Sequence, residues 1–100
     1  MAEWTFLTNH GMVLSHIARH PRITAREVAD SIGITERATR KIIAALLEAE
    51  YITKKREGRR NRYRVNSDLP LRHSSHGETT VGDLLKALGW RKPGRPRKSC

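Results

Sequence analysis

The sequence predicts one small α+β domain that is mainly α-helical and contains a single β-hairpin. The chain has 100 residues, which is too few for more than one ordinary domain. Through residue 50, apolar residues recur at the three- to four-residue spacing of helices that bury one face. From residue 51 the spacing becomes the two-residue alternation of strands, and a Glu-Gly pair interrupts it as a turn would. These patterns predict three core helices, a hairpin and a further C-terminal helix.

Length and composition exclude several classes of protein. No run of 18 apolar residues is present, so no membrane-spanning helix is expected. The first four residues do not begin a basic segment followed by a long apolar stretch, so they do not read as a secretory signal. Cys100 is the only cysteine and cannot form an internal disulfide, which favours a reducing compartment. These features predict a cytoplasmic protein.

The first helix is expected from about Asn9 to His20, and it ends at Pro21 because the residue before a proline disfavours helical angles. Its apolar face comprises Val13, Leu14, Ile17 and Ala18. A second helix is expected to begin after Thr24, which has the spacing of a capping box with Glu27, and to end at Gly33. Its inward face comprises Val28, Ala29 and Ile32.

The third helix is expected to start at its N-cap, Thr35, and to run to about Glu50. Its apolar stripe comprises Ala38, Ile42, Ile43, Leu46 and Leu47. The opposite face carries charged residues near the start of the helix: Glu36, Arg37, Arg40 and Lys41. Two short helices joined by a tight turn with glycine, the second basic near its start, are typical of a helix-turn-helix.

The hairpin is predicted from the alternation that follows. Its elements are expected in this order: a strand over 51–56, a turn that begins at 57–58, a tip formed by 59–61, and a strand over 62–65. In the second strand, arginines alternate with Tyr63 and Val65, so one face is charged and the other is suited to partial burial.

The C-terminal part of the chain divides into a connection, a helix and a tail. Residues 66–78 are polar and are expected to form the connection. A helix is expected at about 79–89, because Thr80 begins a capping-box pattern and apolar residues follow at helical spacing. The domain is therefore expected to cover residues 1–90. Residues 91–100 are rich in proline, glycine and basic side chains, and such a segment buries too little surface to fold, so a disordered tail is expected.

The net charge of +10 is concentrated in two segments. Residues 54–64 hold seven Lys or Arg and one Glu, and residues 91–98 hold five basic and no acidic residues, so these segments carry +6 and +5. The other 81 residues sum to −1. Dense basic runs are typical of contacts with a polyanion, most simply nucleic acid. The alternative is two solvated segments that keep the protein soluble.

Taken together, residues 9–66 resemble a winged helix-turn-helix of the MarR and ArsR families of prokaryotic transcription regulators. The features that carry the resemblance are residues 23–29, 34–41, 46–52 and 58–62, in that order. One departure concerns Glu50, because members usually have glycine where the recognition helix leads into the wing strand. A non-glycine residue there has to accept left-handed backbone angles, at about 1 kcal/mol, or turn another way.

The resemblance implies that a recognition helix, residues 35–50, enters the major groove of double-stranded DNA, and that a wing, residues 56–62, contacts phosphates or the adjacent minor groove. The candidate DNA-binding residues are then Thr24, Arg26, Thr35, Glu36, Arg37, Arg40, Lys41, Lys55, Arg59, Arg60 and Arg62. Arg37 and Arg40 have the chemistry to donate two hydrogen bonds to guanine. Glu36 has two interpretations, as an acceptor from a cytosine amino group or as an ion-pair partner of Arg40 one helical turn away.

Residues 93–98 resemble an AT-hook, a Gly-Arg-Pro core flanked by basic residues that lies in the minor groove of A/T-rich DNA. Arg95 and Arg97 are the candidate contacts, because the enhanced negative potential of a narrow minor groove attracts arginine. Pro93 departs from the motif, since most examples have a basic residue before the glycine. The alternative is a generic basic tail that adds phosphate contacts.

A homodimer is expected, because in the related regulators terminal helices outside the wing commonly form the interface. The candidate interface residues are Trp4, Phe6, Val81, Leu84, Leu85, Leu88 and Trp90. Two-fold symmetry would predict a palindromic site with half-sites about one helical turn apart. The alternative is that the C-terminal helix completes the core of a single chain.

The sequence predicts a non-enzyme without a cofactor or a metal. No catalytic triad, phosphate loop or carboxylate pair stands out, and His73 and His76 lack the further ligands that zinc requires. No small-molecule substrate is expected, and the sequence does not reveal an effector. The leading hypothesis is a sequence-specific transcription regulator that binds double-stranded DNA. Two alternatives stay open: a low-specificity architectural or nucleoid-associated protein, and a winged-helix module that binds protein or RNA.

Overall fold

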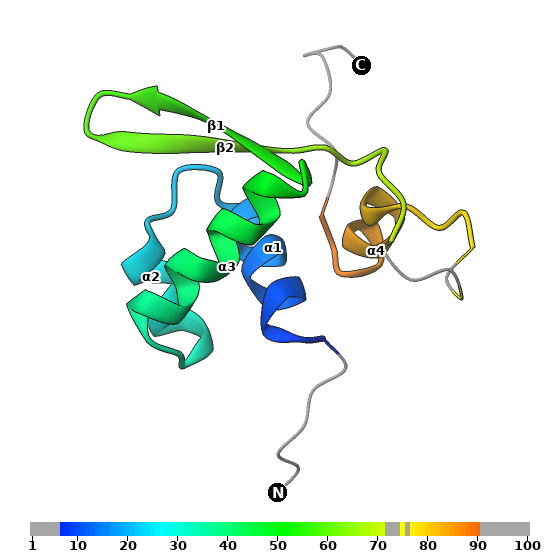
Figure 1. The fold of residues 1–100 in the computed structure, drawn as a ribbon, viewed down its shortest axis with the longest axis horizontal. Coiled ribbons are helices and arrows are strands. Elements are labelled where there is room, and N and C mark those ends of the chain that lie inside the picture. The colour runs from blue at the N-terminus through cyan, green and yellow to red at the C-terminus, as the bar shows by residue number, and fades with distance from the viewer. Residues whose placement is uncertain (1–6, 72–74, 76, 91–100) are drawn as a thin grey trace, which may run out of the picture.

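A computed structural model describes residues 7–71, 75 and 77–90 of the chain. Its elements are α1 (Asn9–Arg19), α2 (Ala25–Ile32), α3 (Glu36–Glu48), β1 (Ile52–Glu57), β2 (Arg60–Val65) and α4 (Val81–Ala87). The hairpin lies across one end of the three N-terminal helices, and α4 lies on the side away from the hairpin turn (Figure 1). The predicted α+β architecture, mainly α-helical with one hairpin, is confirmed. Within the described residues, no helix has the length and apolar character needed to cross a membrane.

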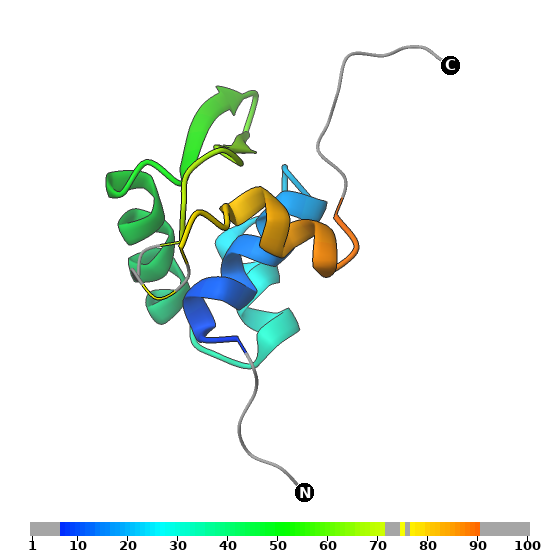
Figure 2. The ribbon, with the colours of Figure 1, turned by 90° about the vertical axis from the view of Figure 1, so that its right-hand side faces the viewer.

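Helix α1 forms the centre of the hydrophobic core. Its residues Val13 and Ile17 have no exposed surface, since the other elements pack around them. Figure 2 shows α3 on one side of α1 and α4 in front of it. The core cluster also includes Val28, Ile42, Ile43, Leu46, Ile52, Tyr63, Val81, Leu85 and Trp90. The apolar stripes expected for the N-terminal helices therefore face one shared core.

The N-terminal ends of α2 and α3 are fixed by the predicted caps. Thr24 and Glu27 form a reciprocal capping box, in which the Glu27 N–H donates to Thr24 Oγ1 at 3.1 Å and the Thr24 N–H donates to Glu27 Oε1 at 2.9 Å. Thr35 Oγ1 accepts from the Ala38 N–H at 3.0 Å. Gly33 ends α2 with a left-handed φ of 81°, as its position predicted.

Helix α3 ends two residues before the predicted boundary, at Glu48. Glu50 then takes a left-handed φ of 70°, so it adopts the geometry for which related proteins use glycine. The Glu50 N–H donates to Leu47 O and the Tyr51 N–H donates to Leu46 O, both at 3.0 Å. This pair of bonds is a Schellman motif, which satisfies the last carbonyls of the helix and directs the chain into β1.

The hairpin turn is shorter than predicted. Glu57 pairs with Arg60, so Gly58 and Arg59 alone form the turn, and the expected three-residue tip is wrong. Asn61 and Arg60 belong to β2. Gly58 has a positive φ of 62° and Arg59 does not, which is the pattern of a type II′ turn that matches the twist of a two-residue hairpin. The buried Tyr63 between exposed Arg62 and Arg64 confirms the alternation predicted for β2.

The segment after the hairpin returns α4 to the core. A bridge between Pro70 and Thr80 holds the two sides of the connection together. Thr80 then starts α4 with the predicted capping box. Gly82 approaches Ser67 so closely that a Cβ there would lie 2.9 Å from it. Trp90 follows α4 and is buried, and its Nε1–H donates to Ala18 O on α1 at 3.1 Å.

Candidate nucleic-acid interface

The start of α3 presents three cations to solvent. Arg37, Arg40 and Lys41 are exposed, while Thr39 and Ile43 on the opposite face are buried. Thr35 fixes where the helix begins, so these cations project from its first two turns. Side chains placed in this way are suited to reach base edges when a helix enters a major groove.

Arg40 is already engaged in the free protein. Its guanidinium contacts Glu36 Oε2 through Nη2 and through Nε, the latter at 3.1 Å. Both side chains are well exposed, so the pair is worth only a few tenths of a kcal/mol. The ion-pair interpretation of Glu36 therefore describes the free protein. Arg37 and Lys41 form no ion pair with another described residue.

The start of α2 carries two further candidate residues, Thr24 and Arg26. The hydroxyl and amide of Thr24 are both used by the capping box with Glu27. The Thr24 amide and, more weakly, the Arg60 guanidinium stabilise the Glu27 carboxylate and hold its pKa below the usual value. Arg26 is exposed and has no ion pair among the described residues.

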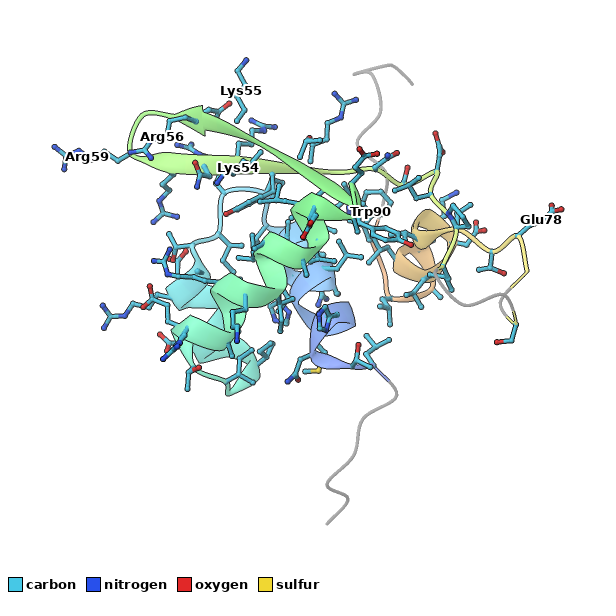
Figure 3. The ribbon with its side chains drawn as sticks, in the orientation of Figure 1. Lys54, Lys55, Arg56, Arg59, Glu78 and Trp90 are labelled. Carbon is cyan, nitrogen blue, oxygen red and sulfur yellow. The ribbon has the colours of Figure 1, made fainter. Side chains whose placement is uncertain are left out.

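The distal part of the hairpin carries unpaired cations. Lys55 and Arg59 point away from the body of the molecule (Figure 3). Neither forms an ion pair with any other residue that the structure describes. Lys54 and Arg56 are exposed on the same strand and were not among the predicted contacts. Period-two alternation places both on the face of buried Ile52, so the available signal for them was the dense basic run 54–64 and not the alternation.

Two of the predicted wing contacts are held by acidic groups. Arg60 Nη1 donates to Arg22 O at 3.0 Å and lies 3.3 Å from Glu27 Oε1. Arg62 Nη1 lies 3.9 Å from Glu57 Oε2, and Arg22 Nε lies 3.7 Å from the other oxygen of Glu57. The structure thus separates Arg60 and Arg62, which have acidic neighbours, from Lys55 and Arg59, which have none among the described residues.

The helix-turn-helix matches a family model by sequence, and the fold matches a solved structure. Residues 7–53 match the family model described as winged helix-turn-helix DNA-binding. The fold is similar to that of MepR, a transcription regulator of the Staphylococcus aureus multidrug efflux pump MepA, with a TM-score of 0.56. This chain has a winged helix fold. In it, α2 and α3 form the helix-turn-helix and the β1–β2 hairpin is the wing.

The similarity to MepR has a limited extent. The two sequences are 13% identical, and the similarity covers 81% of this chain and 56% of the MepR chain. This winged helix therefore spans little more than half the length of MepR. A comparison with curated proteins finds no match. The winged helix-turn-helix fold that the sequence predicted is confirmed, and the matched family model is that of a DNA-binding domain.

The predicted interface residues of the winged helix fall into two groups. Val81, Leu85 and Trp90 are buried in the core of a single chain, as in the alternative in which α4 completes that core. Leu88 is 37% exposed and Leu84 is half-buried, so these two remain available to a partner. Trp4 and Phe6, the other two residues predicted for the dimer interface, lie outside the described part of the chain. Arg95 and Arg97, which were predicted to contact DNA, also lie outside it.

The described part of the winged helix contains no group of three or more histidine, cysteine or acidic side chains placed to hold a metal. His73 and His76, which have a two-ligand spacing in the sequence, lie outside the described residues.

Proposed function

We propose that this winged helix is a sequence-specific, double-stranded DNA-binding transcription regulator without catalytic activity. The observation that carries the proposal is the exposure of unpaired cations at two places on one fold: Arg37 and Lys41 at the start of α3, and Lys55 and Arg59 near the wing turn. Both places lie toward the left-hand end of Figure 1. They suit a duplex that takes α3 into its major groove and the wing along its phosphates or the adjacent minor groove.

The two sets of cations have different proposed roles. Arg37 and Arg40 read bases, and Arg40 exchanges its contact with Glu36 for guanine. Lys55 and Arg59 contact phosphates and supply affinity without sequence choice. Thr24, Arg26 and Thr35, at helix starts near the same end, add phosphate contacts that fix the register.

Selection of binding sites from a random pool of duplex DNA tests the proposal. The wild-type protein is expected to enrich one motif. Arg37→Ala should relax preference at one base step, at a cost of about 1–3 kcal/mol on the preferred site. The matched variant Arg59→Ala should weaken binding to all sequences alike and lower the slope of log K against log salt by about 0.9.

Other outcomes of this selection point to the alternatives. Tight, strongly salt-dependent binding without an enriched motif would identify a low-specificity architectural protein, acting on the nucleoid. Absence of binding to any duplex would leave a winged-helix module for protein or RNA.

We further propose a homodimer in which Leu84 and Leu88 of α4 contribute to the contact. Their exposure beside an otherwise buried stripe supports this arrangement. The mass in solution should be that of two chains, and the selected motif should be a palindrome with half-sites about one helical turn apart. A mass of one chain for the wild-type protein, which retains Leu84 and Leu88, would contradict the proposed homodimer.

The basic segment 91–98 is proposed to follow the minor groove beside the wing. Trp90 fixes where that segment begins, because it is buried against α1 and lines a groove of about 470 Å³ with Arg62 and Arg64 of the hairpin. Removal of residues 91–100 should leave the fold intact and lose most affinity on sites with A/T-rich flanks. An equal loss on G/C-rich flanks would reduce the segment to a generic basic tail.

A further inference from the structure

The outer half of the wing needs an attachment beyond the hydrophobic core. Ile52 and Tyr63, in the inner half of the hairpin, are buried in the core. Lys54, directly opposite Tyr63, is exposed, and nearer the turn the paired residues Arg56 and Asn61 are exposed and partly covered, respectively. A two-stranded hairpin is marginal in water without packing support. Contacts that reach the outer half therefore decide whether the wing keeps a fixed position.

The edge of β2 is joined to the loop between α1 and α2. The Tyr63 N–H points away from β1 and donates to Pro21 O at 2.8 Å. Arg60, three residues nearer the turn, donates to Arg22 O at 3.0 Å in the same loop. The hairpin is thus bonded along its outer edge to a segment more than thirty residues earlier in the chain.

Arg60 connects this edge to the helix-turn-helix itself. Its Nη1 lies 3.3 Å from Glu27 Oε1, and the same oxygen accepts the Thr24 N–H at 2.9 Å in the capping box of α2. The capping box therefore fixes the position of the Glu27 side chain independently of its contact with Arg60. Arg60 is also the first residue of β2, directly after the two-residue turn, so it attaches the wing to the body close to its tip. Its partner across the hairpin, Glu57, adds a longer ion pair with Arg22 of the same loop, at 3.7 Å.

We propose that Arg60 is a positioning residue, which with Glu27 latches the wing onto the start of α2 and so fixes the distance between the wing tip and the recognition helix. This inference rests on the proposed DNA-binding function and refines it. Arg60 is then not a phosphate contact, although it belongs to the basic run of the hairpin. Its guanidinium is directed toward the body, whereas its neighbour Arg59 points away from it (Figure 3).

The latch predicts that Glu27→Gln weakens DNA binding, whereas charge alone predicts tighter binding. Glu27→Gln removes a negative charge near the duplex, which by charge alone should tighten binding. Loss of the latch instead leaves the wing free to move, and the entropic cost of ordering the wing then weakens binding. We expect Glu27→Gln to weaken binding about two- to fivefold, the range set by an exposed ion pair. Gln keeps an oxygen that can accept the Thr24 N–H, so the capping box is retained.

The experiment combines a measurement on the free protein with one on the complex. In the free protein, hydrogen exchange of the Tyr63 amide should become about two- to fivefold faster in Arg60→Met and in Glu27→Gln. The double variant should exchange at the same rate as either single variant, because both substitutions remove the same contact. Arg59→Met is the matched control, since it removes the adjacent arginine, and it should leave this exchange rate unchanged. On DNA, Arg59→Met should lower the salt slope by about 0.9, and Arg60→Met should weaken binding with the slope unchanged.

Two results would overturn the latch. One is an unchanged rate of Tyr63 amide exchange in Arg60→Met. The other is a tighter complex in Glu27→Gln together with a reduced salt slope in Arg60→Met, which would make Arg60 a phosphate contact. A wild-type protein that binds no duplex would refute the proposed function, while amide exchange in the free protein would still test the latch.

Discussion

Arg59 and Arg60 are adjacent in the sequence, and the structure gives them opposite surroundings. Arg59 lies in the turn, points away from the body and has no ion pair among the described residues. Arg60 begins β2 and contacts Arg22 O and Glu27. The resemblance to a winged helix made both of them candidate wing contacts with DNA. The difference shows that the position of acceptors on the rest of the fold decides which cations of a basic hairpin stay available to a polyanion.

The largest expected effect is on stability, and it tests whether burial of Tyr63 anchors the inner half of the hairpin to the core. Tyr63→Ala should lower the free energy of unfolding by about 3 kcal/mol, because it removes a buried ring from the core. Chemical denaturation measures this change. The exposed residue Arg59 provides the comparison, and Arg59→Ala should stay within about 0.5 kcal/mol of the wild type. Equal losses in both variants would mean that burial does not distinguish the two parts of the hairpin.

The next effect concerns the unpaired cations near the turn. The double variant Lys55→Ala, Arg59→Ala should lower the salt slope of DNA binding by about 1.8, with weaker binding to every sequence. Titration of one duplex at several salt concentrations measures the slope. Lys86→Ala removes an exposed cation of α4, away from the wing; it is a control for net charge and should leave the slope unchanged. A similar decrease of the salt slope in Lys86→Ala would show that the slope depends on the net charge of the protein and not on contacts of the wing.

The features predicted correctly from the sequence depend on residues close together in the chain. The capping boxes at Thr24 and Thr80 each join residues three apart, and Gly33 needs only its own backbone angles. The hairpin turn was misplaced, because Arg60 and Asn61 are as compatible with a loop as with a strand. Pairing of Glu57 with Arg60 is what excludes the longer tip.

The features that could not be predicted depend on contacts between distant residues. Arg60 meets Glu27 across 33 positions, and nothing in either local pattern indicates the partner. Trp90 reaches Ala18 across 72 positions, so the choice between a dimer contact and the core of one chain was open until the path of the connection was known. The fold therefore determines which cations stay unpaired, and the basic run identifies only the segment that contains them.

A smaller effect is expected where α3 leads into the hairpin. Glu50→Gly should raise the free energy of unfolding by about 1 kcal/mol, because Glu50 has a φ of 70° and glycine adopts that angle without strain. The substitution should leave the salt slope of DNA binding unchanged, since Glu50 lies at the base of the wing. Gly33→Ala is the converse variant, and it should lower stability through the φ of 81° at that position. A less stable Glu50→Gly variant would show that the Glu50 side chain contributes more than its backbone strain costs.

The smallest effect is the response of the Arg60 contact to acid. The Thr24 amide and the Arg60 guanidinium lower the pKa of Glu27, so Glu27 contributes stability that is present above the ordinary pKa of a glutamate and is lost as pH falls through its value in the folded protein. Protection of the Tyr63 amide should therefore decrease between about pH 5 and pH 3, a window in which carboxyl groups and not imidazoles ordinarily titrate.

The matched variants separate this response from general acid effects. Glu27→Gln should show no such decrease in Tyr63 protection, because it has no proton to gain. Asp83→Asn removes a carboxyl group on α4 whose pKa is lowered by the Thr80 amide, and it should keep the wild-type decrease, since that group lies in a different cap. An acid-induced decrease that persists in Glu27→Gln would mean that another group, not the contact between Glu27 and Arg60, holds the outer wing in place.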